Sequence, residues 1–108
     1  MITAQVIENC IEELRALTKV NLAVYDLDGT EVASTFEGDV ISGELIRGFA
    51  DSPAGSQTIG KDHLLKVMDE GELTYILAAR GNSDQAHMIG KIAVSQIQQL
   101  IMAYKERL

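Results

Sequence analysis

The spacing of apolar residues changes along this chain and divides it into segments. Between positions 2 and 17 the apolar residues recur every three or four positions, which predicts one amphipathic helix ending near Thr18. From Val20 to Tyr25 the period falls to two, which predicts a strand. Asp28-Gly29 then favours a tight hairpin turn, and 32–36 is the expected returning strand.

The second half of the chain repeats this change of period. Apolar residues from Ile41 to Phe49 predict a short helix, which the Pro- and Gly-containing segment 51–55 ends. From Gln85 to Leu108 a long helical pattern is interrupted by Gly90 alone. Between these helices we expect three strands separated by glycine-containing turns: 56–59, 64–68 and 73–79.

Short turns join all neighbouring strands except the pair that flanks the second helix. This connectivity predicts an α+β fold, in the order α-β-β-α-β-β-β-α, with a five-stranded, mainly antiparallel sheet and the terminal helices on one face. GAF, PAS, profilin-like and roadblock domains share this order, and such folds sense ligands or mediate protein contacts. The 108 residues suit one domain, spanning 1–108.

Composition narrows the class of protein. Nine Lys and Arg against 16 Asp and Glu give a net charge of −7, which disfavours direct binding to DNA or RNA. The single cysteine, Cys10, excludes a disulfide within these residues and is typical of a reducing compartment. The sequence has no apolar run of membrane-spanning length and no signal-peptide pattern. We therefore expect a cytoplasmic domain without a membrane partner.

One short segment resembles a catalytic motif. Val24 to Thr30 looks like the first motif of haloacid-dehalogenase-type phosphatases, in which Asp26 would be the nucleophile and Asp28 the general acid beside Mg²⁺. That family requires a parallel sheet whose crossover units each take about 30 residues or more, and this element order leaves no room for them. We therefore interpret Asp28-Gly29 as a hairpin turn and expect no enzyme activity.

Metal sites are disfavoured for similar reasons. The positions of calcium-loop ligands are partly matched, but Glu31 stands where the loop requires glycine. His63 and His87 each lack a second His or Cys at metal-ligand spacing. We expect neither a metal nor a cofactor. The matched calcium-loop positions are Asp26, Asp28, Thr30 and Glu37.

The last helix carries more apolar surface than a sheet needs. Its apolar arc covers about half of the circumference, whereas packing on a sheet requires a stripe somewhat over 100° wide. Either the first helix or a second copy of the chain covers the surplus, and we expect a homodimer. The residues predicted for the dimer contact are Ile97, Ile101, Tyr104 and Leu108.

The last helix also ends without a Gly or Pro signal, which favours a longer parent protein.

Three strings covering nearly the whole chain resemble the N-terminal regulatory region of bacterial transcription regulators of the CdaR/PucR type: VNLAVYDLDGTEVAST, SPAGSQTIGKDHLLKVMDEGELTYILAARG and MIGKIAVSQIQQLIMAYKERL. In that family a sensing domain precedes a helical connector and a C-terminal helix-turn-helix. The resemblance implies a small-molecule-sensing and dimerisation domain of a longer regulator. The alternative is a roadblock- or profilin-like protein-interaction module without a ligand.

A sensing domain would hold its effector between the sheet and the second helix. Polar side chains of the second helix and the last three strands are the candidates, with Ser56 and Lys66 among them. Arg and Lys in this set suit a carboxylate or phosphate, so the unknown effector is expected to be anionic. The residues predicted to bind it are Arg47, Gln57, Lys61, His63, Tyr75 and Arg80.

Overall fold

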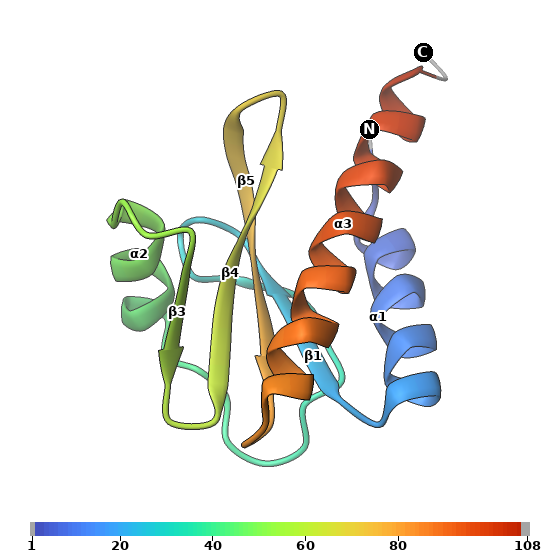
Figure 1. Cartoon of the computed structure of the whole chain (residues 1–108). Helices are drawn as coiled ribbons and strands as arrows, with labels where there is room; N and C mark the ends of the chain where they lie inside the picture. Colours follow the sequence, from blue (N-terminus) through green and yellow to red (C-terminus); the bar gives the residue numbers. More distant parts are fainter. Residues whose placement is uncertain (1, 107–108) are drawn as a thin grey trace.

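The structure is a computed structural model, and it describes residues 2–106. The predicted order of helices and strands is confirmed (Figure 1). The elements are α1 (Ala4–Thr18), β1 (Asn21–Tyr25), β2 (Glu31–Ser34), α2 (Gly43–Asp51), β3 (Ser56–Ile59), β4 (Asp62–Asp69), β5 (Glu72–Arg80) and α3 (Asp84–Glu106).

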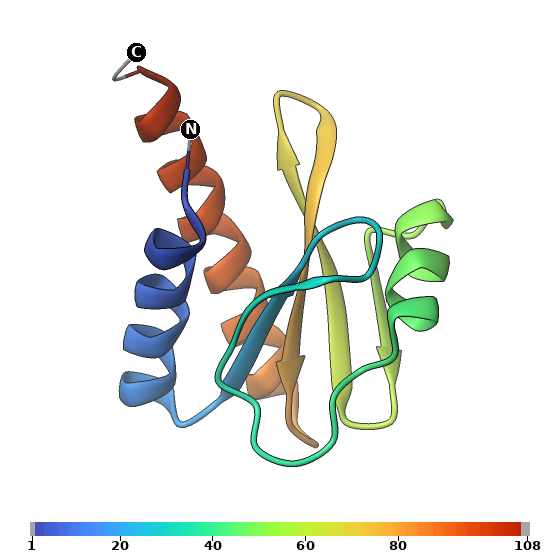
Figure 2. The ribbon, with the colours of Figure 1, turned by 180° about the vertical axis from the view of Figure 1, so that it is seen from behind.

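The five strands form one sheet in the order β2-β1-β5-β4-β3, and every neighbouring pair is antiparallel. β5 is central, so the two hairpins β1–β2 and β3–β4 extend the sheet on either side of it. α1 and α3 lie side by side over one face, and α2 lies on the other (Figures 1 and 2). The predicted fold class is confirmed.

Alternating strand side chains fill a core on each face of the sheet. On one face, Ile7 and Ile11 of α1 and Ile97 of α3 are fully buried against the sheet. On the other face, Ile46 and Phe49 of α2 pack on it. Each large aliphatic side chain buried in this way stabilises the fold by about 1.5–3 kcal/mol. Both faces are therefore covered by this chain's own side chains.

Helices α1 and α2 each begin directly after an N-cap residue. The Ser42 hydroxyl accepts the Leu45 N–H, so α2 begins at Gly43 and not at Ile41 as predicted. α1 begins after Thr3, whose hydroxyl accepts the N–H of Val6. In the described residues, no helix combines the length and the apolar composition of a membrane span.

The β1–β2 turn is tight and has a positive φ at Gly29, as predicted, but it is a three-residue loop over 27–29 and not a two-residue turn centred on Asp28-Gly29. The Gly29 N–H donates to the Asp26 carbonyl at 3.0 Å, and the Asp26 N–H donates to the Thr30 carbonyl at 2.8 Å. Gly29 has a φ of +93°, and a Cβ on it would lie 2.7 Å from the Gly43 Cα. Glycine is therefore required at position 29 for two reasons. The turn needs a positive φ there, and the contact with Gly43, the first residue of α2, leaves no room for a Cβ.

Candidate interaction surfaces

The predicted ligand-binding residues are divided between the two faces of the sheet. His63 and Tyr75 face α1 and α3, since the His63 ring lies 5.5 Å from the His87 ring of α3 and Tyr75 packs on the α1–α3 core. Arg80 lies on the α2 face, where its guanidinium stacks on Phe36. Because the sheet separates these groups, the six residues predicted together cannot bind one small ligand.

Hydrogen bonds and a ring contact fix the position of the Arg80 side chain. Its Nε and Nη2 donate to the Asp62 carboxylate at 2.6 and 3.1 Å, and its Nη1 donates to the Asp39 carbonyl at 2.6 Å. The hydrogen bond to Asp62 raises the pKa of Arg80, and the guanidinium lies 4.0 Å from the centre of the Phe36 ring. These contacts fasten the loop before α2 to the sheet, which is a structural role.

An open hollow of about 670 Å³ lies beside Arg80, between the start of α2 and the β3–β4 turn. Lys61 and Arg80 line it, but so do three acidic residues, Glu37, Asp39 and Asp62. Because the acidic side chains outnumber the basic ones, the charge of this hollow does not favour the anionic effector expected from the sequence.

The remaining predicted ligand residues lie on the surface or tie elements together. Gln57 is exposed on β3, and Arg47 is exposed on α2, where it donates to the Asp28 carbonyl at 2.9 Å. His63 Nε2 lies 2.9 Å from the Gly81 carbonyl oxygen, which can only accept, so this nitrogen carries the proton. Nδ1 of the same ring contacts the Thr58 hydroxyl at 3.1 Å. His63 thus connects β3 to the loop before α3.

The two aspartates of the phosphatase-like string lie at the hairpin turn. The Asp28 carboxylate accepts the Thr30 N–H at 2.9 Å, and hydrogen bonds from Thr30 lower the pKa of Asp28. Asp26 is exposed at the end of β1, whose neighbours are both antiparallel. Among residues 2–106, no group of three or more His, Cys, Asp or Glu side chains is placed to hold a metal ion.

We predict that the domain does not hydrolyse an aryl phosphate with Mg²⁺. Asp28 holds the turn through its carboxylate, and no crossover helix follows β1 to build the parallel sheet that such phosphatases need. A chromogenic phosphate assay of the wild type and of Asp26→Asn should give the same background rate. A Mg²⁺-dependent rate lost in Asp26→Asn would contradict this prediction.

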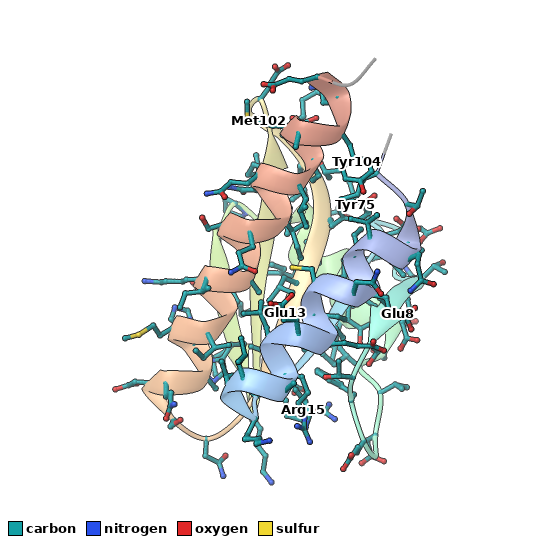
Figure 3. All side chains as sticks on the ribbon, turned by 90° about the vertical axis from the view of Figure 1, so that its right-hand side faces the viewer. Glu8, Glu13, Arg15, Tyr75, Met102 and Tyr104 are labelled. Atoms are coloured by element: carbon teal, nitrogen blue, oxygen red, sulfur yellow. The ribbon has the colours of Figure 1, made fainter. Side chains whose placement is uncertain are left out.

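The dimer contact predicted on the last helix needs correction. Ile97 and Ile101 lie in the core between α3 and the sheet, so they cannot supply a contact with a second copy. Tyr104 is half-buried, and Leu108 lies outside the described residues. α1 packs along α3 (Figure 3) and covers part of the surplus apolar arc, while Ile92 stays 41% exposed.

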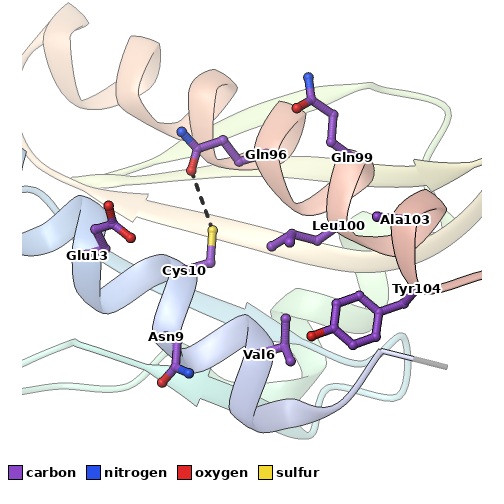
Figure 4. A pocket seen from close by; sticks show the side chains of 9 residues that line it. All are labelled: Val6, Asn9, Cys10, Glu13, Gln96, Gln99, Leu100, Ala103 and Tyr104. Atoms are coloured by element: carbon purple, nitrogen blue, oxygen red, sulfur yellow. Dashed lines mark hydrogen bonds between the residues drawn. The ribbon is translucent and has the colours of Figure 1, made fainter. Parts of the chain in front are cut away.

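The two helices leave an open groove of about 630 Å³ between them (Figure 4). In its floor, the Cys10 thiol donates to Gln96 Oε1 at 3.6 Å. Burial raises the pKa of Cys10, and the nearby Glu13 charge raises it further, so the thiol is neutral and weakly nucleophilic. The groove is lined by Val6, Asn9, Cys10, Glu13, Gln96, Gln99, Leu100, Ala103 and Tyr104.

The sheet has two edges, and they differ. β2 carries Glu31 and an irregular register, two features that discourage pairing with another strand. β3 contains no charged residue and pairs regularly with β4, and Ser56, Gln57 and Thr58 are exposed. In residues 2–106 no strand covers the outer side of β3. Gln57 and Ser56 were predicted as candidates for ligand binding, but pairing of this edge with another strand was not predicted from the sequence.

No protein-family model and no curated protein matches this chain. Among solved structures, the chain is similar to Myxococcus xanthus MglB, with a TM-score of 0.61 and 15% sequence identity over 93% of this chain and 90% of MglB. This likeness shows a shared fold, the roadblock/profilin-like architecture. The comparisons lend no support to an origin in the CdaR/PucR regulators.

Proposed function

We propose that this domain is a protein-interaction module that forms a symmetric homodimer through β3 and the adjoining side of α2. The observation that carries the proposal is the uncovered, uncharged edge of β3. An exposed edge of this kind is a template for another strand. The roadblock/profilin-like fold shared with MglB supports this function, because domains of this architecture include modules that mediate contacts.

The register of the β3–β4 hairpin determines which backbone groups of β3 point outward. The Lys66 N–H donates to the Gly55 carbonyl, and the pairing continues with Gln57 opposite Leu64. Because hydrogen-bonded and non-hydrogen-bonded pairs alternate in an antiparallel ladder, Ser56 and Thr58 direct their N–H and C=O groups away from β4.

These outward groups are self-complementary about Gln57. If two copies of β3 pair antiparallel, Ser56 of one copy faces Thr58 of the other, and both pairs are of the hydrogen-bonded type. Gln57 then lies opposite its own counterpart, on the two-fold axis. No charge meets a like charge in this pairing, since residues 56–59 are all uncharged. A second copy therefore fits the edge.

Apolar side chains next to β3 extend the proposed contact. Val40 is 70% exposed and Leu45 of α2 is 45% exposed, and both line the hollow that also contains Ile59 of β3. No atom lies within 4 Å of the position that a Cβ on Gly48 of α2 would occupy, so a neighbouring helix can approach closely there. Burial of such side chains contributes the hydrophobic part that strand pairing alone lacks.

A second candidate function is the sensing domain of a regulator, with DNA binding elsewhere in a longer protein. The observation that favours it is the open hollow of about 670 Å³ beside Arg80, which is large enough for a small molecule, although its mixed charges do not select an anion. Its effector would bind on the α2 face, close to the proposed dimer contact.

Proline at Ser56 tests the strand pairing. Ser56→Pro removes an outward N–H without removing a bond to β4, and proline is tolerated on edge strands. We expect this variant to sediment as a monomer at concentrations where the wild type and Ser56→Ala are dimers. A wild type that is monomeric throughout, or a Ser56→Pro variant that stays dimeric, would refute the proposed edge contact.

A further inference from the structure

We propose that the groove between α1 and α3 binds a cationic amphipathic helix of a partner protein. This goes beyond the proposed dimer, because α1 and α3, whose side chains line the groove, lie on the opposite face of the sheet from α2 (Figures 1 and 2). The groove therefore stays open when two copies pair through β3.

The groove has the length of a short helix. Val6, Cys10, Glu13 and Leu17 follow one another at helical spacing, so they share one side of α1. Ile92, Gln96 and Ala103 do the same on α3. In each row 11 residue steps separate the first residue from the last, or about 17 Å at 1.5 Å per step, which is three helical turns.

The walls of the groove combine apolar and uncharged polar groups. Val6, Leu100 and Ala103 line it, with the neutral Cys10 thiol between them (Figure 4). Leu17 is 74% exposed and Ile92 is 41% exposed, and they continue the two rows beyond the lined part. Glu13 and Gln96 interrupt the apolar side chains in the two rows, so the groove presents a mixed surface whose exposed apolar side chains mark a contact.

The charge of the groove lining indicates which kind of partner helix binds there. Within residues 2–106, Glu13 is the only charged side chain that lines the groove. Lys105, the nearest lysine along α3, is drawn to the β4–β5 turn by ion pairs with Asp69 at 3.1 Å and Glu70 at 3.4 Å. A second copy of this chain has a net charge of −7, so in this groove it would bring further negative charge towards Glu13. A helix that carries Lys or Arg beside its apolar stripe complements the groove.

The single cysteine reports occupancy of the groove directly. The probe is a 14-residue amphipathic peptide of leucine and lysine, and its control is the same peptide with glutamate in place of lysine. The alkylation rate of Cys10 by iodoacetamide is measured by mass spectrometry with and without each peptide. We expect the lysine peptide to slow alkylation at least about fivefold near saturation, and the glutamate peptide to have no effect.

Two neighbouring glutamates provide a matched pair of variants. Glu13 and Glu12 are both exposed on α1, but only Glu13 lines the groove. Each variant's alkylation rate is compared with its own rate without peptide, because the Glu13 charge also affects the thiol. We expect Glu13→Lys to weaken peptide binding about tenfold and Glu12→Lys by less than about twofold.

Equal weakening by both substitutions would show diffuse attraction and refute the groove, as would protection of Cys10 by the glutamate peptide or no protection by either peptide. The monomeric Ser56→Pro variant should bind the lysine peptide as the wild type does. The groove and the β3 contact can therefore fail separately.

Discussion

Replacing Gly29 by alanine should lower the free energy of unfolding by about 2–5 kcal/mol. Left-handed backbone geometry costs a residue with a Cβ about 1–2 kcal/mol. The new Cβ would also lie 2.7 Å from both the Cα and the carbonyl oxygen of Gly43, and backbone atoms cannot rotate away. Forcing an atom into such a packed contact costs about 1–3 kcal/mol more.

Gly38→Ala is the matched control for this prediction. Gly38 has a φ of +89°, close to that of Gly29, but no atom lies within 4 Å of the Cβ position. It should therefore show the backbone cost alone, about 1–2 kcal/mol. Urea denaturation followed by circular dichroism gives both values. Equal losses in the two variants would show that the β1–β2 turn does not contact α2 as described.

The fold was predictable because its local signals agree with one another. Helical spacing in α1, alternation in β1 and the Asp28-Gly29 turn each lead to the element that the structure contains. The contact between Gly29 and Gly43 was not predictable, because two glycines 14 positions apart carry no periodic signal. The first residue of α2 was misplaced for a related reason, since Ile41 is buried like a helical residue although Ser42 caps the helix.

The candidate sites were less predictable than the fold. The apolar arc of α3 predicts burial but not the surface that buries it. Ile97 and Ile101 lie in the core that α3 forms with the sheet and α1, and not against a second copy. Arg80 has the chemistry of a ligand-binding residue, yet its partners Asp62 and Asp39 are distant in sequence. The β3 edge depends on backbone groups, which every sequence has, so it becomes visible only when the strand order is known.

Opposite charges at position 57 should assemble a dimer that like charges prevent. In the proposed pairing, Gln57 lies opposite its own copy in a non-hydrogen-bonded pair, where the two Cβ atoms are about 5 Å apart. Opposite charges on such a cross-strand pair stabilise by roughly 0.2–1 kcal/mol, and like charges directly opposite each other destabilise by a similar amount. Gln57 is exposed on β3, so neither substitution disturbs the core.

The decisive measurement is sedimentation velocity on Gln57→Glu, on Gln57→Lys and on their equimolar mixture, at a concentration where the wild type is a dimer. A homodimer through β3 predicts that each variant alone sediments as a monomer and that the mixture sediments as a dimer. A mixture that remains monomeric, or single variants that remain dimeric, would contradict a two-fold axis at Gln57 and with it the proposed interaction module.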